Sequence, residues 1–180
     1  MSNPASSPIL HACLAEFRSL KKMAEVALHQ LDDSQFHIKI NPLQNSIAAI
    51  LQHIAGNMLS RWTDFLTTDG EKPNRDREAE FADQSLSRDQ LLALWEQGWK
   101  VLFDALSPLT DADLHRIVHI RNEPHTVFQA INRQTAHYAT HVGQILLIAK
   151  HLVGPTWKYA TIPPGQSNAF NAAKGLPTKP

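Results

Sequence analysis

The sequence predicts an all-α fold, a four-helix bundle with a long crossover between its second and third helices. Four long segments repeat apolar residues at the helical spacing, and each begins at residue types that cap helices. A polar segment, residues 67–86, separates the second helical segment from the third. Because a connection of that length can return along the bundle, we expect those two helices to run parallel.

The first two predicted helices begin at capping residues. The first opens at Ser7, is followed by a proline that suits the first helical turn, and ends near Asp33. The second begins at Asn41 or a few residues later, at Asn45 or Ser46. Each then carries apolar residues three or four positions apart, which predicts one buried face.

The segment before the third helix has the composition of a surface crossover. Residues 67–86 contain glycine, proline and many charged side chains, with little apolar periodicity. The third helix begins at Ser87, where Gln90 completes a capping box, and ends at Pro108. The sequence therefore predicts a long surface crossover between the second and third helices.

The connector between the third and fourth helices has a different pattern. Within residues 110–124, the stretch 117–121 alternates apolar and polar residues, which predicts a short strand followed by a turn. The fourth helix begins at Thr126, with Gln129 completing a capping box, and stops at Gly154.

We expect residues 1–180 to form a single domain, because this length suits one hydrophobic core. The tail from about residue 155 to 180 is rich in Pro, Gly, Asn and Lys, and we expect it to pack on the surface. Four apolar side chains could anchor it there: Trp157, Tyr159, Ile162 and Phe170.

Composition removes several classes of function. The formal net charge is zero, which argues against nucleic-acid binding and against attraction to an anionic membrane. Neither a signal peptide nor an apolar run long enough to cross a membrane is visible, so we expect a cytoplasmic protein. The one cysteine, Cys13, lies in an apolar helical pattern and is interpreted as a core residue.

Three histidines form the most informative pattern in the chain. His137 and His141 lie one turn apart on the fourth predicted helix, and His53 lies on the second, each at the edge of an apolar stripe. Three neutral imidazoles from two helices would make a half-open site for a divalent metal. The alternative is three half-buried histidines that only hydrogen-bond to neighbours. A second pair, His115 and His119, lies in the alternating segment, where the same spacing separates the rings.

Missing motifs narrow the chemistry. The chain has no Glu-x-x-His pair, which disfavours a carboxylate-rich di-iron bundle. Tyr138 stands where a zinc protease of the His-Glu-x-x-His type needs its glutamate. Glycine-rich phosphate loops, Gly-x-Ser-x-Gly elbows and Cys-x-x-Cys pairs are also absent from the sequence. A site built from histidines alone remains.

Two stretches of the chain resemble a known family. Residues 45–81, which include HIAGN, and residues 123–150, which include HYATHVGQI, are similar to the DinB-like (DinB/YfiT-like putative metalloenzyme) superfamily, in a bacterial branch of unknown function. The resemblance covers nearly the whole chain, and these elements are specific in combination though weak singly.

The resemblance implies an up-down-down-up four-helix bundle, frequently a homodimer, that holds a divalent metal such as zinc or nickel. The metal positions of the family correspond here to His53, His137 and His141. Some relatives are thiol S-transferases that join bacillithiol or mycothiol to an electrophile, and others are mycothiol-dependent isomerases. We therefore expect a metal-dependent enzyme that transfers a small thiol to an electrophilic substrate. The alternative is a non-catalytic, metal-binding or stress-related structural bundle.

Three further side chains are candidates for ligand contacts. Asn57 follows His53 by one turn and Gln144 follows His141 similarly, so either amide could orient a ligand or a histidine ring. Arg61 could bind an anionic group of the substrate. The alternative interpretations are structural amides and a surface pair between the arginine and Asp64.

Overall fold

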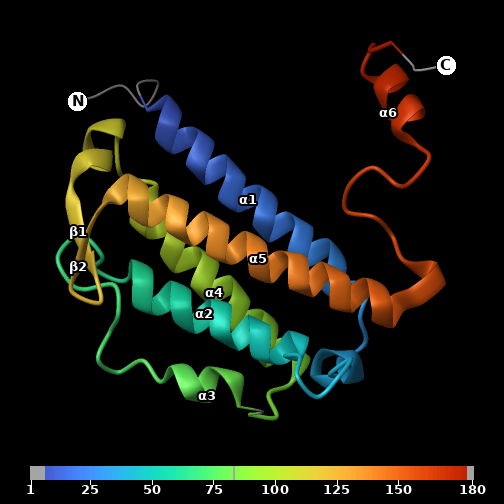
Figure 1. The fold of residues 1–180 in the computed structure, drawn as a ribbon, viewed down its shortest axis with the longest axis horizontal. Coiled ribbons are helices and arrows are strands. Elements are labelled where there is room, and N and C mark those ends of the chain that lie inside the picture. The colour runs from blue at the N-terminus through green and yellow to red at the C-terminus, as the bar shows by residue number, and fades with distance from the viewer. Residues whose placement is uncertain (1–6, 83, 178–180) are drawn as a thin grey trace.

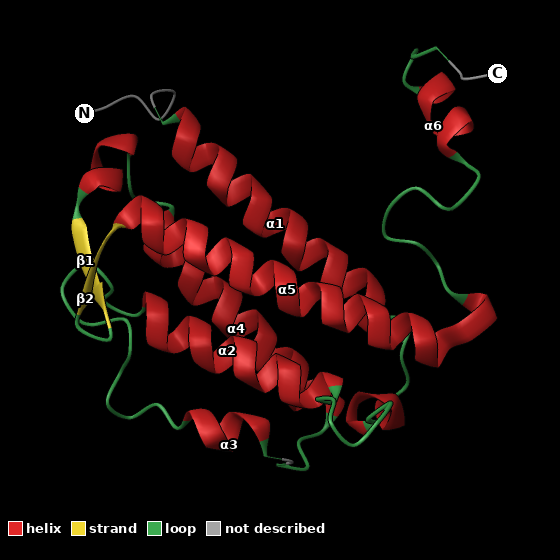
Figure 2. Cartoon of the chain, viewed as in Figure 1, coloured by secondary structure: helices red, strands yellow, loops and turns green. Residues whose placement is uncertain are grey.

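Four long helices form the body of the computed structural model, which describes residues 7–82 and 84–177 (Figure 1). They are α1 (Pro8–Leu28), α2 (Ile47–Trp62), α4 (Arg88–Leu106) and α5 (Val127–Val153). The most extensive contacts join α2 to α4 and α1 to α5. Figure 2 shows that the rest is loops, short helices and one small sheet, so the prediction of a mainly helical protein is confirmed. No helix among the described residues is long and apolar enough to cross a membrane.

Local capping decides where most of the helices begin. Ser87 and Thr126 form the predicted capping boxes, in which each hydroxyl accepts from a backbone N–H and a glutamine side chain reaches back. Ser46 caps α2 by accepting from the N–H of Ala49 at 3.2 Å. Of the predicted starts, Ser46 is therefore the observed one. α1 ends at Leu28, earlier than predicted, because Asp32 caps a separate 3-10 turn, η2 (Asp33–His37).

The crossover contains a helix that the sequence did not predict. α3 (Arg77–Phe81) begins after Asp76, whose carboxylate accepts from the N–H of Ala79 at 3.0 Å, and it packs against α2. Five residues are too few to display an apolar period. The predicted crossover therefore contains one short helix that its composition does not reveal.

The connector forms a β-hairpin beside the ends of α2 and α5. It contains η3 (Asp111–His115), β1 (Ile117–Ile120) and β2 (Glu123–Thr126), with the two strands antiparallel. The predicted strand is confirmed, but the second strand was missed because its Pro124 argues against a strand. The turn at residues 121–122 adopts positive φ at both positions, and the Asp69 carboxylate accepts from both of its N–H groups.

One aromatic side chain from each long helix meets at the centre of the core. Phe17 of α1 contacts Trp62, Trp99 and Tyr138 of the other three helices, with ring centroids 5.9–6.5 Å apart. All four side chains are buried. Their edge-on contacts favour one arrangement of the helices, because aromatic rings pack at preferred angles.

The tail departs from the expected surface packing. Trp157 packs against the core, and Gln30 of the α1 end exchanges two hydrogen bonds with the backbone of Lys158. Beyond this point the chain extends away from the long helices and forms α6 (Ser167–Ala173) (Figure 1). Ile162 and Phe170 are 39% and 45% exposed and anchor nothing on the bundle. A seven-residue helix with one large apolar side chain has too little apolar area to hold itself against the body.

Two buried hydrogen bonds cross the core between α2 and α5. The Trp62 indole Nε1–H donates to the Tyr138 hydroxyl at 3.1 Å, and that hydroxyl donates to Asn57 Oδ1 at 3.0 Å. The indole can only donate, which fixes the direction of both bonds. The Tyr138 hydroxyl therefore satisfies one buried donor and one buried acceptor.

We predict that Tyr138→Phe lowers the free energy of unfolding by about 1–3 kcal/mol, because it leaves both partners of the hydroxyl buried without a hydrogen bond. Equilibrium unfolding in urea measures the change. Tyr159→Phe is the control, since Tyr159 is 39% exposed, and it should change stability little. Equal stability of the wild type and Tyr138→Phe would contradict this account of the core.

Candidate metal centre

The three predicted histidines come together between α2 and α5. Nε2 of His137 lies 3.2 Å from Nε2 of His53 and 3.2 Å from Nε2 of His141. One ligand atom from each residue can be chosen so that all lie within 4.8 Å of one another. Two nitrogens bound to one tetrahedral zinc ion lie about 3.3 Å apart, so this spacing matches a shared metal. The three histidines thus lie close enough to hold a metal ion, whereas His115 and His119 do not join them.

Glu80 and Phe81 of α3 orient the His53 ring. Nδ1–H of His53 donates to Glu80 Oε2 at 2.8 Å, and the ring stacks on Phe81 with centroids 4.5 Å apart. Since the proton sits on Nδ1, Nε2 keeps its lone pair. A carboxylate behind a ligating imidazole is a common arrangement in metal sites, where it fixes the tautomer and raises the basicity of the ring.

Arg75 holds the Glu80 carboxylate with two hydrogen bonds. Nε of Arg75 donates to Oε1 at 2.7 Å and Nη2 donates to Oε2 at 2.8 Å. Burial opposes the charge, but the hydrogen bonds from Arg75 and His53 prevail and lower the pKa of Glu80. Gly56 makes this approach possible, because a Cβ atom on it would overlap the carboxylate. Glu80 is therefore an ionised acceptor in a fixed position.

The two histidines of α5 are held in neutral form. Nδ1–H of His141 donates to Gln144 Oε1 at 2.9 Å, which leaves its Nε2 unprotonated and directed at His137. Burial, together with the neighbouring His141 and His53, lowers the pKa of His137 to about 3. Burial also lowers the pKa of His141. Neutral imidazoles are the form that binds metal ions.

A polar cavity of about 220 Å³ opens beside the histidines. His53 and His137 form part of its wall, as do two of the predicted contact residues, Asn57 and Arg61. Since the oxygen of Asn57 accepts from Tyr138, its NH₂ group is the part that remains for a ligand. Gln144 does not line this cavity and serves to orient His141.

Arg61 is placed differently from the surface pair with Asp64 that the sequence also allowed. Its side chain is buried, with the residue only 5% exposed, and no ion pair joins it to Asp64 among the described residues. Burial lowers the pKa of Arg61. It is a cation in the wall of the cavity.

Sequence reasoning missed several side chains of the site. Glu80, Arg75 and Phe81 all belong to the crossover that was predicted to be a plain surface connection. The one available signal was Asp76, a capping residue followed by acidic side chains typical of a first helical turn. That signal predicts a helix start but gives no indication of which helix α3 packs against.

Comparison of the chain with curated proteins and with solved structures gives no match. A family model described as "Protein of unknown function (DUF1572)" matches residues 5–166. The matched range includes all three histidines as well as Glu80 and Arg61. Because the match spans most of the sequence, the chain belongs to this family of proteins of unknown function.

Proposed function

We propose that the chain binds one divalent metal ion, zinc or nickel, through Nε2 of His53, His137 and His141. The observation that carries this proposal is the convergence of three Nε2 atoms, two of them on rings whose Nδ1–H is already bound by a neighbour. Imidazole suits both metals. Three protein ligands leave at least one position for an exchangeable ligand, as in catalytic sites.

We also propose that the chain is a DinB-like four-helix bundle with the up-down-down-up order. Support comes from Figure 1, in which α1 and α5 run in one direction and α2 and α4 in the other. The crossover that carries α3 lies between the second and third long helices. One histidine on the second long helix and two on the last agree with the ligand positions of that superfamily.

The reaction we propose is transfer of a small thiol to an electrophilic carbon. A divalent metal at the three histidines would act as a Lewis acid, lowering the pKa of a coordinated thiol toward neutrality. The sulfur then forms a bond to the carbon, a leaving group departs with the electron pair of the broken bond, and the thiol proton passes to water. The choice of a thiol rests on the resemblance to DinB-like transferases. The cavity beside the histidines supports a reaction over a purely structural role, because a metal that only tied α2 to α5 needs no adjoining space.

We predict near-stoichiometric zinc or nickel in the purified wild type and its loss in His137→Ala, since two histidines bind a metal much more weakly than three. Elemental analysis after dialysis, without chelator or affinity-tag metal, measures both. His151→Ala is the matched control, because His151 is exposed near the end of the same helix. If the folded wild type takes up neither added zinc nor added nickel, the proposal of a metal site is wrong.

We predict that the metal-loaded protein accelerates the reaction of a small thiol with 1-chloro-2,4-dinitrobenzene, with release of chloride. Cysteine, bacillithiol and mycothiol are compared by absorbance of the aryl thioether. The acceleration should disappear in His137→Ala and after chelation. Metal binding without acceleration for any of the three thiols would favour the non-catalytic alternative.

We predict that Glu80→Gln weakens metal binding by about 10–100-fold, because the amide holds His53 less firmly and makes its ring less basic. Competition with a chromogenic chelator measures the affinity. Glu78→Gln is the control, since Glu78 lies on the same short helix with its side chain 89% exposed. If both variants bind metal like the wild type, Glu80 has no part in positioning His53.

A further inference from the structure

We infer that the cavity beside the three histidines binds an anionic group, a carboxylate or a phosphate, of a small-molecule substrate. The inference rests on the proposed function, because it assigns the substrate class of that same site. The cavity wall contains five arginines: Arg61, Arg75, Arg77, Arg121 and Arg133. Glu71 is the one carboxylate in the same wall. The whole chain has no net charge, so this local excess of positive charge is a property of the cavity.

Arg61 is a buried cation whose Nε and Nη1 atoms have no hydrogen-bond partner among the described residues. The residue is only 5% exposed. The guanidinium stays charged even where burial disfavours the charge. A buried charge without a partner costs several kcal/mol, which an anionic ligand would offset.

The backbone at Gly70 passes close to the Arg61 guanidinium. A Cβ atom on Gly70 would lie 2.5 Å from Nη1 of Arg61, so a larger residue there would require the guanidinium to shift. The loop is fixed on both sides of that position: Ser60 Oγ donates to the Gly70 carbonyl at 3.0 Å, and the Gly70 N–H donates to the His119 carbonyl at 2.8 Å. The backbone beside the cation is therefore fixed, which reduces the entropy that the loop loses on binding.

The other arginines come from four separate segments and differ in how far they are neutralised. Arg75 is bound by Glu80 and Glu71, and Arg121 lies 3.4 Å from Glu71. Arg77 stacks over the Phe81 ring at 5.1 Å, and its ion pair with a neighbouring glutamate is exposed and weak. Arg133 has no ion pair among the described residues. Positive charge thus remains available at the mouth of the cavity as well as inside it.

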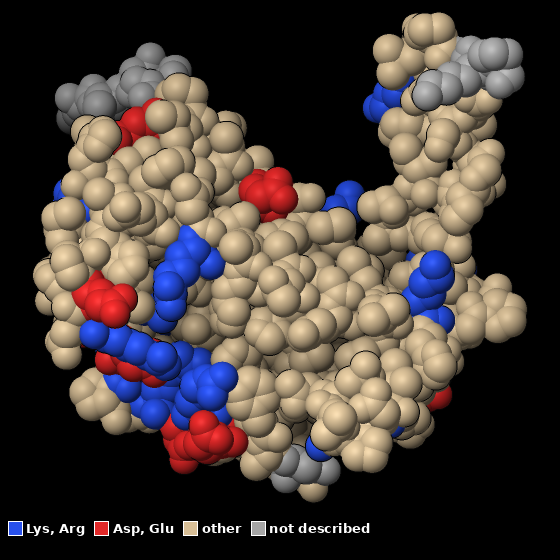
Figure 3. All heavy atoms as spheres, viewed as in Figure 1, with Lys and Arg blue, Asp and Glu red and all other residues tan. Residues whose placement is uncertain are grey.

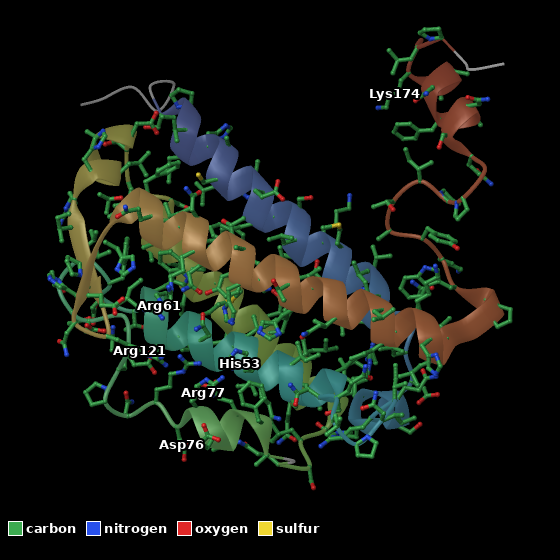
Figure 4. All side chains as sticks on the ribbon, in the orientation of Figure 1. His53, Arg61, Asp76, Arg77, Arg121 and Lys174 are labelled. Carbon is green, nitrogen blue, oxygen red and sulfur yellow. The ribbon has the colours of Figure 1, made fainter. Side chains whose placement is uncertain are left out.

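The arginines of the cavity lie on the same part of the molecule as His53. Figure 3 shows lysine and arginine atoms gathered on one part of the surface, near α3 and the hairpin, with fewer acidic atoms among and beside them. Figure 4 shows Arg61, Arg77 and Arg121 on the same side of the long helices as His53. Because His53 and His137 line the same cavity, an anion bound there lies next to the proposed metal position.

The cavity also offers uncharged polar groups and limits the size of the ligand. Gln134 is 2% exposed, and its Oε1 atom is buried without a hydrogen-bond partner. With the NH₂ group of Asn57, it could bind polar atoms next to the anionic group. A volume of about 220 Å³ is below that of pockets that enclose a whole drug-sized ligand, so it fits the anionic part of a substrate.

Titration of the full-length, metal-loaded protein with inorganic phosphate and with malonate, at low salt, tests the inference. Isothermal titration calorimetry gives the affinities, and neutral malonamide is the control ligand. We expect both anions to bind, and the tighter of the two distinguishes a phosphate site from a carboxylate site. Arg61→Met and Arg133→Gln should each weaken binding about tenfold or more, because each removes a charge-assisted contact. Arg18→Gln, an arginine on α1 that packs over Phe103, should bind like the wild type.

Folding and metal loading are checked separately. Arg61→Met should raise the thermal midpoint in the absence of anion, because it removes an unpaired buried charge. Phosphate should raise the midpoint of the wild type more than that of the variant. Chelated wild type and His137→Ala should still bind phosphate, though more weakly, so failure of the metal site leaves this inference standing. Three results would overturn it: anions that bind no better than malonamide, unchanged affinity in both arginine variants, or phosphate binding that vanishes on chelation.

Discussion

The candidate site depends on one buried carboxylate. Glu80 accepts from Arg75 with both oxygens and from Nδ1–H of His53 with one of them. These bonds attach α3 to α2, bring Phe81 against the histidine ring, and decide which nitrogen of His53 faces the other two rings. Gly56 has no side chain where the carboxylate lies. Removing either partner of such a buried pair costs more than the pair contributes to stability, so this contact specifies geometry more than it stabilises the fold.

The core and the site are built on the same two helices. His53 and Asn57 lie one turn apart on α2, while His137 and Tyr138 are adjacent on α5. The hydrogen bond from Tyr138 to Asn57 and the aromatic contacts of Phe17 therefore set the spacing of α2 and α5 one layer from the histidines. A shift of one helix along the other would break these buried hydrogen bonds. Rigid support of this kind gives a metal site its geometry.

Local chemistry explains which features could be predicted from the sequence. The caps at Ser87 and Thr126 and the pairing of His137 with His141 depend only on residues within one turn, so a single sequence reveals them. Glu80 could not be predicted, because α3 is too short to show an apolar period. The role of Glu80 also depends on its hydrogen bond to His53 of α2, which the sequence does not reveal. The arginines of the cavity come from five segments, and only the tertiary structure brings them together. The prediction for the tail was wrong in part: Trp157 packs against the core, but Ile162 and Phe170 belong to a segment with too little apolar area to hold itself there.

The side chains of Arg61 and Arg75 are both buried, but only Arg61 lacks a carboxylate partner among the described residues, so only its burial lowers the stability of the fold without compensation. Arg75 is bound by two carboxylates, which raise its pKa against the effect of burial, whereas Arg61 lies deeper and has none. Both guanidinium groups also help to keep His137 neutral, the form a metal requires. A divalent ion beside several arginines nevertheless meets electrostatic repulsion, and an anion in the cavity would relieve it. Metal and anion should therefore each increase the affinity of the protein for the other, since coupling between two sites is reciprocal. The unpaired Arg61 would therefore favour substrates with an anionic group, and the binding of that group would strengthen metal binding.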